Sequence, residues 1–67
     1  MMAAHAVVQV DPILCEDGRN VAFYAWKDDD EMIFWSISLP MAIEEDVFED
    51  LRSDWVELGW LMLMQQA

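Results

Sequence analysis

The densest group of potential metal ligands in this sequence is the acidic run Asp28-Asp29-Asp30-Glu31. Carboxylate oxygens are the ligands that Ca²⁺ and Mg²⁺ prefer. The run lacks the alternating ligands, the Gly at the sixth position and the Glu at the twelfth position of a calcium-binding loop. We therefore interpret it as a solvated hairpin loop whose charge opposes aggregation, and we predict no metal site.

Nucleophilic or acid–base chemistry would have to use His5 or Cys15, the single His and the single Cys of the chain. His5 lies near the start of the chain, where fraying is the default, and Cys15 precedes Glu16 and Asp17, whereas reactive cysteines occupy electropositive surroundings. One Cys and one His provide neither an intramolecular disulfide nor the ligands of a structural zinc. We predict a binding protein with no catalytic residues and no cofactor.

Composition indicates one small folded domain with an anionic exterior. The 67 residues include 14 acidic and 3 basic residues, for a formal charge of -11, yet 57% are apolar and four are Trp. A disordered acidic tail would lack these apolar and aromatic residues. The first residues carry no Lys or Arg, and the longest apolar stretches are far below the ~20 residues of a membrane span. We expect a cytoplasmic protein that does not bind membranes, in the host cytoplasm if a phage encodes it.

Period-two patterns predict a three-stranded antiparallel β-meander. Apolar residues at 6–10 and 13–15 precede Asp17-Gly18, a pair that suits a hairpin turn, and two further strands follow at 21–26 and 32–38. Pairing Trp26 with Met32 sets the register and places three further pairs on the core side: Ala25–Ile33, Phe23–Trp35 and Val21–Ile37. The opposite side is too aromatic to meet only water, so we expect it to be covered. It carries Ala22, Tyr24, Trp26, Met32, Phe34 and Ser36.

From Pro40 the period changes to 3.6, which predicts a C-terminal amphipathic helix capped near Ser38 or Leu39. Its apolar stripe is Ile43, Val47, Phe48, Leu51, Trp55, Leu58 and Met62. Its acidic side is Glu45, Asp46, Glu49, Asp50, Asp54 and Glu57. The predicted fold is a single α+β domain over residues 1–67, with this helix packed on one face of the meander. Its predicted core is Phe23, Ile33, Trp35, Ile37, Val47, Leu51, Trp55 and Leu58.

The stripe fails after Val56, and two outcomes stay open. Either the last turns are buried on several sides, or Gly59 ends the helix and residues 60–64 form another element, such as a strand. At ~100° per residue, an uninterrupted helix would place Trp60 among Asp46, Glu49 and Glu57, in water. We expect it to act there as an apolar anchor for a partner.

The excess of negative charge costs stability through self-repulsion and therefore suggests a function. Residues 44–57 span ~20 Å of helix, close to six phosphate steps of one DNA strand, so their carboxylates approximate its charge density. We predict that the protein mimics a nucleic-acid backbone and binds a basic groove. The alternatives are a host protein whose charge is only solubilising and a small adaptor or antitoxin-like module, monomeric or homodimeric.

In its length, its charge, its α+β pattern and the run EEDVFEDLRSDWVE, the chain resembles the small acidic inhibitors that phages make. These include DNA-mimicking anti-CRISPR proteins and uracil-glycosylase inhibitors. The resemblance implies a partner such as the DNA-binding or PAM-reading surface of a CRISPR effector. The predicted partner-binding residues are Glu45, Asp46, Glu49, Asp50, Asp54, Glu57, Trp60, Asp28, Asp29, Asp30 and Glu31.

Overall fold

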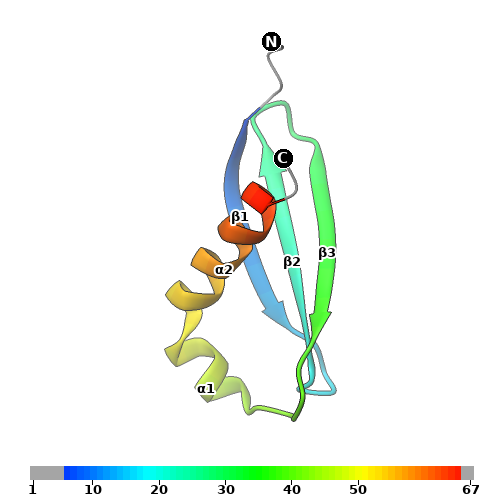
Figure 1. The fold of residues 1–67 in the computed structure, drawn as a ribbon, viewed down its shortest axis with the longest axis vertical. Helices are drawn as coiled ribbons and strands as arrows, with labels where there is room; N and C mark the ends of the chain where they lie inside the picture. The colour runs from blue at the N-terminus through cyan, green and yellow to red at the C-terminus, as the bar shows by residue number, and fades with distance from the viewer. Residues whose placement is uncertain (1–5, 66–67) are drawn as a thin grey trace.

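An antiparallel sheet of three strands carries two helices on one side, as the computed structural model of residues 6–65 shows (Figure 1). The strands β1 (Val7–Leu14), β2 (Asn20–Lys27) and β3 (Met32–Ser38) lie in the order β1-β2-β3. The helices α1 (Glu45–Asp50) and α2 (Arg52–Gln65) follow, and α2 packs against β1. The predicted α+β fold with a three-stranded meander and a C-terminal helical segment is confirmed. No helix of residues 6–65 is long and apolar enough to cross a membrane.

The first hairpin turn is built by Asp17 and Gly18, as predicted, with separate roles for the two residues. Gly18 has a φ of 69°, which glycine adopts without a steric cost. The Asp17 carboxylate accepts the backbone N–H groups of Arg19 (2.9 Å) and Asn20 (3.1 Å) and the side-chain amide of Asn20 (2.6 Å). These hydrogen bonds, the one from the Arg19 backbone foremost, lower the pKa of Asp17. The turn is thus held by a charged acceptor.

The predicted register of β2 and β3 is confirmed for all four pairs, from Trp26–Met32 to Val21–Ile37. Alternation then places Val21, Phe23 and Ala25 on the core side, where all three are fully buried. Phe23 stacks on Trp35 with ring centroids 5.3 Å apart. β1 adds Val10, Pro12 and Leu14, which lie opposite Ala25, Phe23 and Val21. These residues form the face of the sheet that packs against the helices.

The helical segment begins at Glu45, so the predicted start near Pro40, with a cap at Ser38 or Leu39, is wrong. The linker 39–44 is tied to the first hairpin instead: the N–H of Leu39 donates to the carbonyl of Arg19 (2.6 Å), and that of Ile43 to the carbonyl of Gly18 (2.8 Å). A helix starting at Pro40 would orient the backbone N–H groups of this segment along its own axis, so they could not donate to the hairpin in this way. Helical bonding starts with the N–H of Phe48, which donates to the carbonyl of Glu44 (3.0 Å).

The predicted continuous helix is also interrupted, at Leu51, where φ is -105° and ψ is 17°. The interruption changes which residues face the sheet. Phe48 is buried and stacks on Trp55 (5.5 Å between centroids), whereas Val47 and Leu51 are 44% and 43% exposed. The prediction that Val47 and Leu51 belong to the core is therefore wrong, because it assumed one straight, uninterrupted helix.

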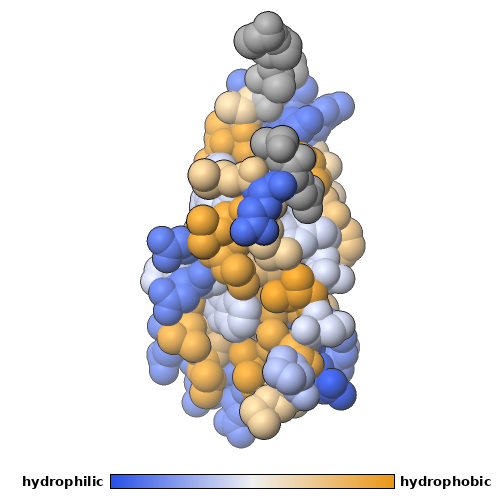
Figure 2. Space-filling view, in the orientation of Figure 1, coloured by the Kyte–Doolittle hydropathy of each residue, from blue (hydrophilic) through white to orange (hydrophobic). Residues whose placement is uncertain are grey.

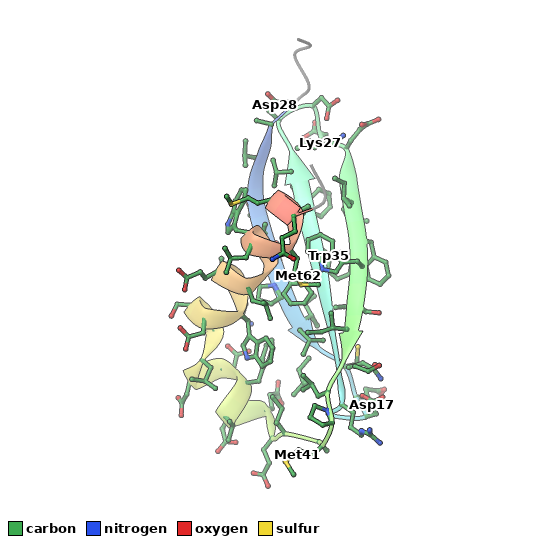
Figure 3. The ribbon with its side chains drawn as sticks, in the orientation of Figure 1. Asp17, Lys27, Asp28, Trp35, Met41 and Met62 are labelled. Atoms are coloured by element: carbon green, nitrogen blue, oxygen red, sulfur yellow. The ribbon has the colours of Figure 1, made fainter. Side chains whose placement is uncertain are left out.

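α2 continues through Gly59, so this residue does not end the helix. Gly59 is buried, and a Cβ atom there would lie 2.7 Å from Cγ1 of Val10 and 3.0 Å from Cδ2 of Phe23. Glycine therefore allows the helix backbone to approach both strands closely. After it, Trp60, Met62 and Leu63 pack against the core, and Figure 3 shows Met62 on α2 and Trp35 on β3. The last turns are thus partly buried on more than one side.

Candidate protein-binding surfaces

Exposed acidic residues follow the chain from Glu44, just before α1, to Glu57 in the first half of α2, and we call this set the helical acid face. All of its carboxylate residues are exposed. They are Glu44, Glu45, Asp46, Glu49, Asp50, Asp54 and Glu57. Figure 2 shows hydrophilic side chains along the side of the molecule where these helices lie, interleaved with apolar ones. The structure thus exposes all six acidic residues that the periodicity placed on one side of the helix.

One cation accompanies these carboxylates. Arg52 donates from Nε to Oε1 of Glu49 (2.9 Å) and from Nη2 to Oε2 (2.8 Å), a two-bond geometry that suits a planar guanidinium. The Arg52 side chain lowers the pKa of Glu49, and Glu49 raises that of Arg52. Seven acidic residues and one basic residue leave residues 44–57 with a formal charge of -6. The charge that a partner meets comes mainly from the residues other than Glu49.

The shape of the helical acid face differs from the straight rod expected from the sequence. The break at Leu51 separates the carboxylates of α1 from Asp54 and Glu57 on α2, and the two helices run in different directions (Figure 1). Val47 on α1 and Leu51 just after it are exposed and directly follow the acidic residues Asp46 and Asp50 in the sequence. The face therefore combines charge with a small apolar contact. The 3.6-residue periodicity did not predict this exposed pair, because it places both residues in the core.

Trp60 does not lie exposed among the carboxylates. It is half-buried and packs against the core cluster. The predicted exposed position assumed an uninterrupted helix with a fixed rotation per residue. The helix is interrupted at Leu51, and α2 begins at Arg52. Angular positions calculated for one straight helix therefore do not describe where Trp60 lies relative to Asp46 and Glu49. Trp60 is therefore a packing residue of the helix–sheet interface in this chain.

The acidic loop 28–31 belongs to another part of the surface. Figure 3 places Lys27 and Asp28 at one end of the sheet, and Asp17 and Met41 at the other. In the loop, Lys27 pairs with Glu31 (3.6 Å), and the carboxylate of Asp29 accepts the N–H of Glu31 (3.1 Å). Within residues 6–65 no three Asp, Glu, His or Cys side chains are arranged to hold a metal ion. The structure does not bring this loop and the helical acid face together.

The side of the sheet opposite the helices forms the open sheet face. Its members follow from strand alternation and the observed register. They are Gln9, Asp11, Ile13, Asn20, Ala22, Tyr24, Trp26, Met32, Phe34, Ser36 and Ser38. Tyr24 and Phe34 pack together with centroids 5.1 Å apart, yet Phe34 is 55% exposed, Ile13 48%, Met32 44% and Trp26 38%. The cover expected for this face is not supplied by any element of residues 6–65.

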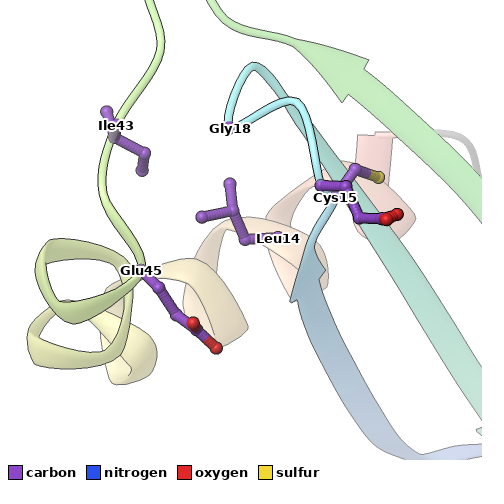
Figure 4. A pocket seen from close by; sticks show the side chains of 6 residues that line it. Leu14, Cys15, Gly18, Ile43 and Glu45 are labelled. Atoms are coloured by element: carbon purple, nitrogen blue, oxygen red, sulfur yellow. The ribbon is translucent and has the colours of Figure 1, made fainter.

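Two shallow pockets lie around the first hairpin turn. One, of about 270 Å³, is lined by Leu14, Cys15, Glu16, Gly18, Ile43 and Glu45 (Figure 4), and the other, of about 280 Å³, by Asp17, Arg19, Asn20 and Ser38. Both reach nearly the size of small ligand sites, which the sequence did not predict. The pocket beside the Cys15 thiol includes the carboxylates of Glu16 and Glu45 and no basic side chain.

Comparisons of the chain with protein-family models, with curated proteins and with solved structures find no match.

Proposed function

We propose that this protein is an inhibitor that binds the nucleic-acid-binding surface of another protein through the helical acid face. One observation carries the proposal: seven exposed carboxylates within fourteen residues share a single cation, Arg52. Such a surface resembles a nucleic-acid strand in sign and in charge density. A groove lined by Lys and Arg, built to hold phosphates, would attract it over distances of about a Debye length.

The apolar pair Val47 and Leu51 gives this surface a second component. Electrostatic attraction mainly accelerates association, whereas a desolvated apolar contact slows dissociation. Leu51 lies one helical turn after Val47, and its N–H donates to the Val47 carbonyl (3.3 Å). The two side chains can therefore contact one partner surface together. We propose that they replace Trp60 as the apolar anchor.

The resemblance to phage-made inhibitors points to a DNA-binding surface of a host defence complex, such as a CRISPR effector, as the target. In that case the protein competes with DNA and needs no base-specific contact. Arginine and lysine side chains that normally contact phosphates would contact Asp46, Asp50, Asp54 and Glu57.

Salt-dependent capture tests the proposal. The immobilised protein is incubated with bacterial lysate, bound proteins are eluted by stepwise salt, and each eluted protein is tested for displacement by duplex DNA. We expect a DNA-binding protein that elutes as salt rises and that duplex DNA displaces. A variant with Asp46→Asn, Asp50→Asn, Asp54→Asn and Glu57→Gln should lose this capture while remaining folded.

Matched controls separate the helical acid face from overall charge. Asp28→Asn with Asp30→Asn neutralises two charges at the far end of the sheet, and Asn tolerates the positive φ of 70° at position 30. We expect this control to bind more tightly than Asp46→Asn with Asp50→Asn, which has the same net charge. Equal losses in the two variants, or a captured protein that DNA does not displace, would show that the mimicry proposal is wrong.

A further inference from the structure

The open sheet face carries four of the ten large apolar side chains that residues 6–65 expose, and no described element covers it. Aromatic side chains present about 150–250 Å² each. At the exposures given above, Phe34, Ile13, Met32 and Trp26 together leave roughly 300 Å² of apolar surface in water. A patch of this size on a small protein is often an interaction site.

Charge selects the partner for this face. By strand alternation, Asp11 is the one carboxylate residue among its members, and the Gln9 side-chain amide donates to it (2.8 Å). Arg52 of α2 lies beside β1, the strand that contains Asp11: its Nη1 donates to the carbonyl of Pro12 (3.4 Å). A basic partner would be drawn to the helical acid face instead. A second copy of this chain, which also carries a charge of -11, is repelled by most of the surface and least by this face.

We propose that two copies of the chain associate through their open sheet faces, with the sheets stacked face to face about a two-fold axis. An axis parallel to the strands would place β1 of one copy over β3 of the other, so that the two Asp11 carboxylates lie at opposite margins of the interface. Stacked sheets pack about 10 Å apart, and the aromatic side chains of β2 and β3 fill that space. Both helical acid faces then point outward, so each dimer could bind two basic surfaces.

The interface is small. The two apolar patches and their polar margins together come to about 1,000 Å², the lower limit for specific association, so the dimer should dissociate reversibly. Salt should strengthen it, because screening removes repulsion between the two anionic bodies while the apolar contact persists. This response is opposite to the one expected for a basic target at the helical acid face. An experiment can therefore refute the proposed dimer without refuting the proposed function, and the reverse.

Analytical ultracentrifugation of the 67-residue chain from about 1 to about 500 μM, at about 0.05 and about 0.5 M NaCl, tests the dimer. We expect a monomer–dimer equilibrium that tightens with salt. Phe34→Glu should raise the dimer dissociation constant at least a hundredfold, because the new charge enters the interface twice. Leu61→Glu is the matched control: it adds the same charge at a residue 49% exposed on α2 and should change the constant less than threefold.

A second variant covers the case in which Phe34→Glu unfolds. Met32→Glu at the start of β3 also places a charge on the open sheet face and should also dissociate the dimer, with circular dichroism checking the fold. A wild-type chain that stays monomeric at the highest concentration and salt would overturn the proposal. A dimer that Leu61→Glu disrupts and Phe34→Glu does not would overturn it as well. So would a monomer whose open sheet face binds a different protein.

Discussion

Replacing Gly59 by Ala tests how closely α2 approaches the sheet. The new Cβ atom would lie 2.7 Å from Cγ1 of Val10 and 3.0 Å from Cδ2 of Phe23, distances shorter than ordinary carbon contacts. Both neighbours are buried, at 5% and 0% exposure. Val10 is β-branched and restricted in χ1, so its methyl group has little freedom to move away. The helix must therefore shift outward or the core must strain.

Two opposing effects determine the magnitude. Ala is favoured over Gly inside a helix by about 1 kcal/mol, whereas overpacking a core costs about 1–3 kcal/mol. Here the second effect should prevail, because backbone and two buried side chains meet at one point. We expect Gly59→Ala to lower the free energy of unfolding by about 1 kcal/mol, which corresponds to roughly 4–8 °C in Tm for a domain of this size.

Urea unfolding followed by circular dichroism measures this change. Ser53→Ala, at an exposed position of the same helix, is the control for helix propensity and should stabilise by a few tenths of a kcal/mol. Combining Gly59→Ala with Val10→Ala removes the closest methyl group, so the Gly59→Ala effect should become smaller or change sign in that background. If Gly59→Ala alone stabilises the protein by about 1 kcal/mol, α2 does not contact β1 and β2 as described.

Three further predictions follow from the core and the first turn. Phe48→Ala should cost about 3–5 kcal/mol in thermal or urea unfolding, because Phe48 is 1% exposed, whereas Leu51→Ala should change stability by less than about 1 kcal/mol; equal losses would place Leu51 in the core. Trp55→Phe keeps an aromatic ring beside Phe48 and removes a buried indole N–H that has no acceptor among residues 6–65, so its Tm should stay level or rise; a clear drop would show that this N–H is satisfied. Because the folded chain lowers the pKa of Asp17, its carboxylate stabilises the fold above the unfolded value near 4 and loses this effect as pH falls through the folded value. Asp17→Asn should therefore show a weaker decline of stability in acid titrations, and an unchanged decline would contradict the role of the turn.

The sheet could be predicted from local pattern because its determinants are local. Alternation between Val21 and Trp26, and again from Met32 to Ser38, leaves one register that buries both apolar sets. Asp17-Gly18 specifies the turn before them through its own side chain and φ angle. No distant residue is needed to set these features.

The helical segment depends on contacts between distant residues, and there the sequence was insufficient. The linker bonds from Leu39 and Ile43 to the first hairpin delay the helix start, and no periodicity encodes them. The interruption of the helix at Leu51 then leaves Val47 and Leu51 exposed, although the periodicity places both in the core. Gly59 was a candidate helix end by composition, and only its distance from Val10 shows its packing role.

The acidic residues of the candidate site could be predicted, whereas its apolar part could not. Charged side chains such as Asp46 and Glu57 stay exposed for almost any helix orientation, because burying them unpaired is costly. The positions of Leu51 and Trp60 depend on the rotation of each helix about its axis. An interruption of one residue is enough to alter that rotation.

The contact of Gly59 with Val10 and Phe23 also has a consequence for the order of folding. The two hairpins join neighbouring segments, whereas the contact with Val10 closes a loop of about fifty residues and that with Phe23 a loop of about 36. The entropy cost of closing such long loops places these contacts late in folding. We expect the transition state to contain the meander with α2 still undocked. Substitutions in the turn at Asp17 should then change mainly the folding rate, and those at Gly59 mainly the unfolding rate.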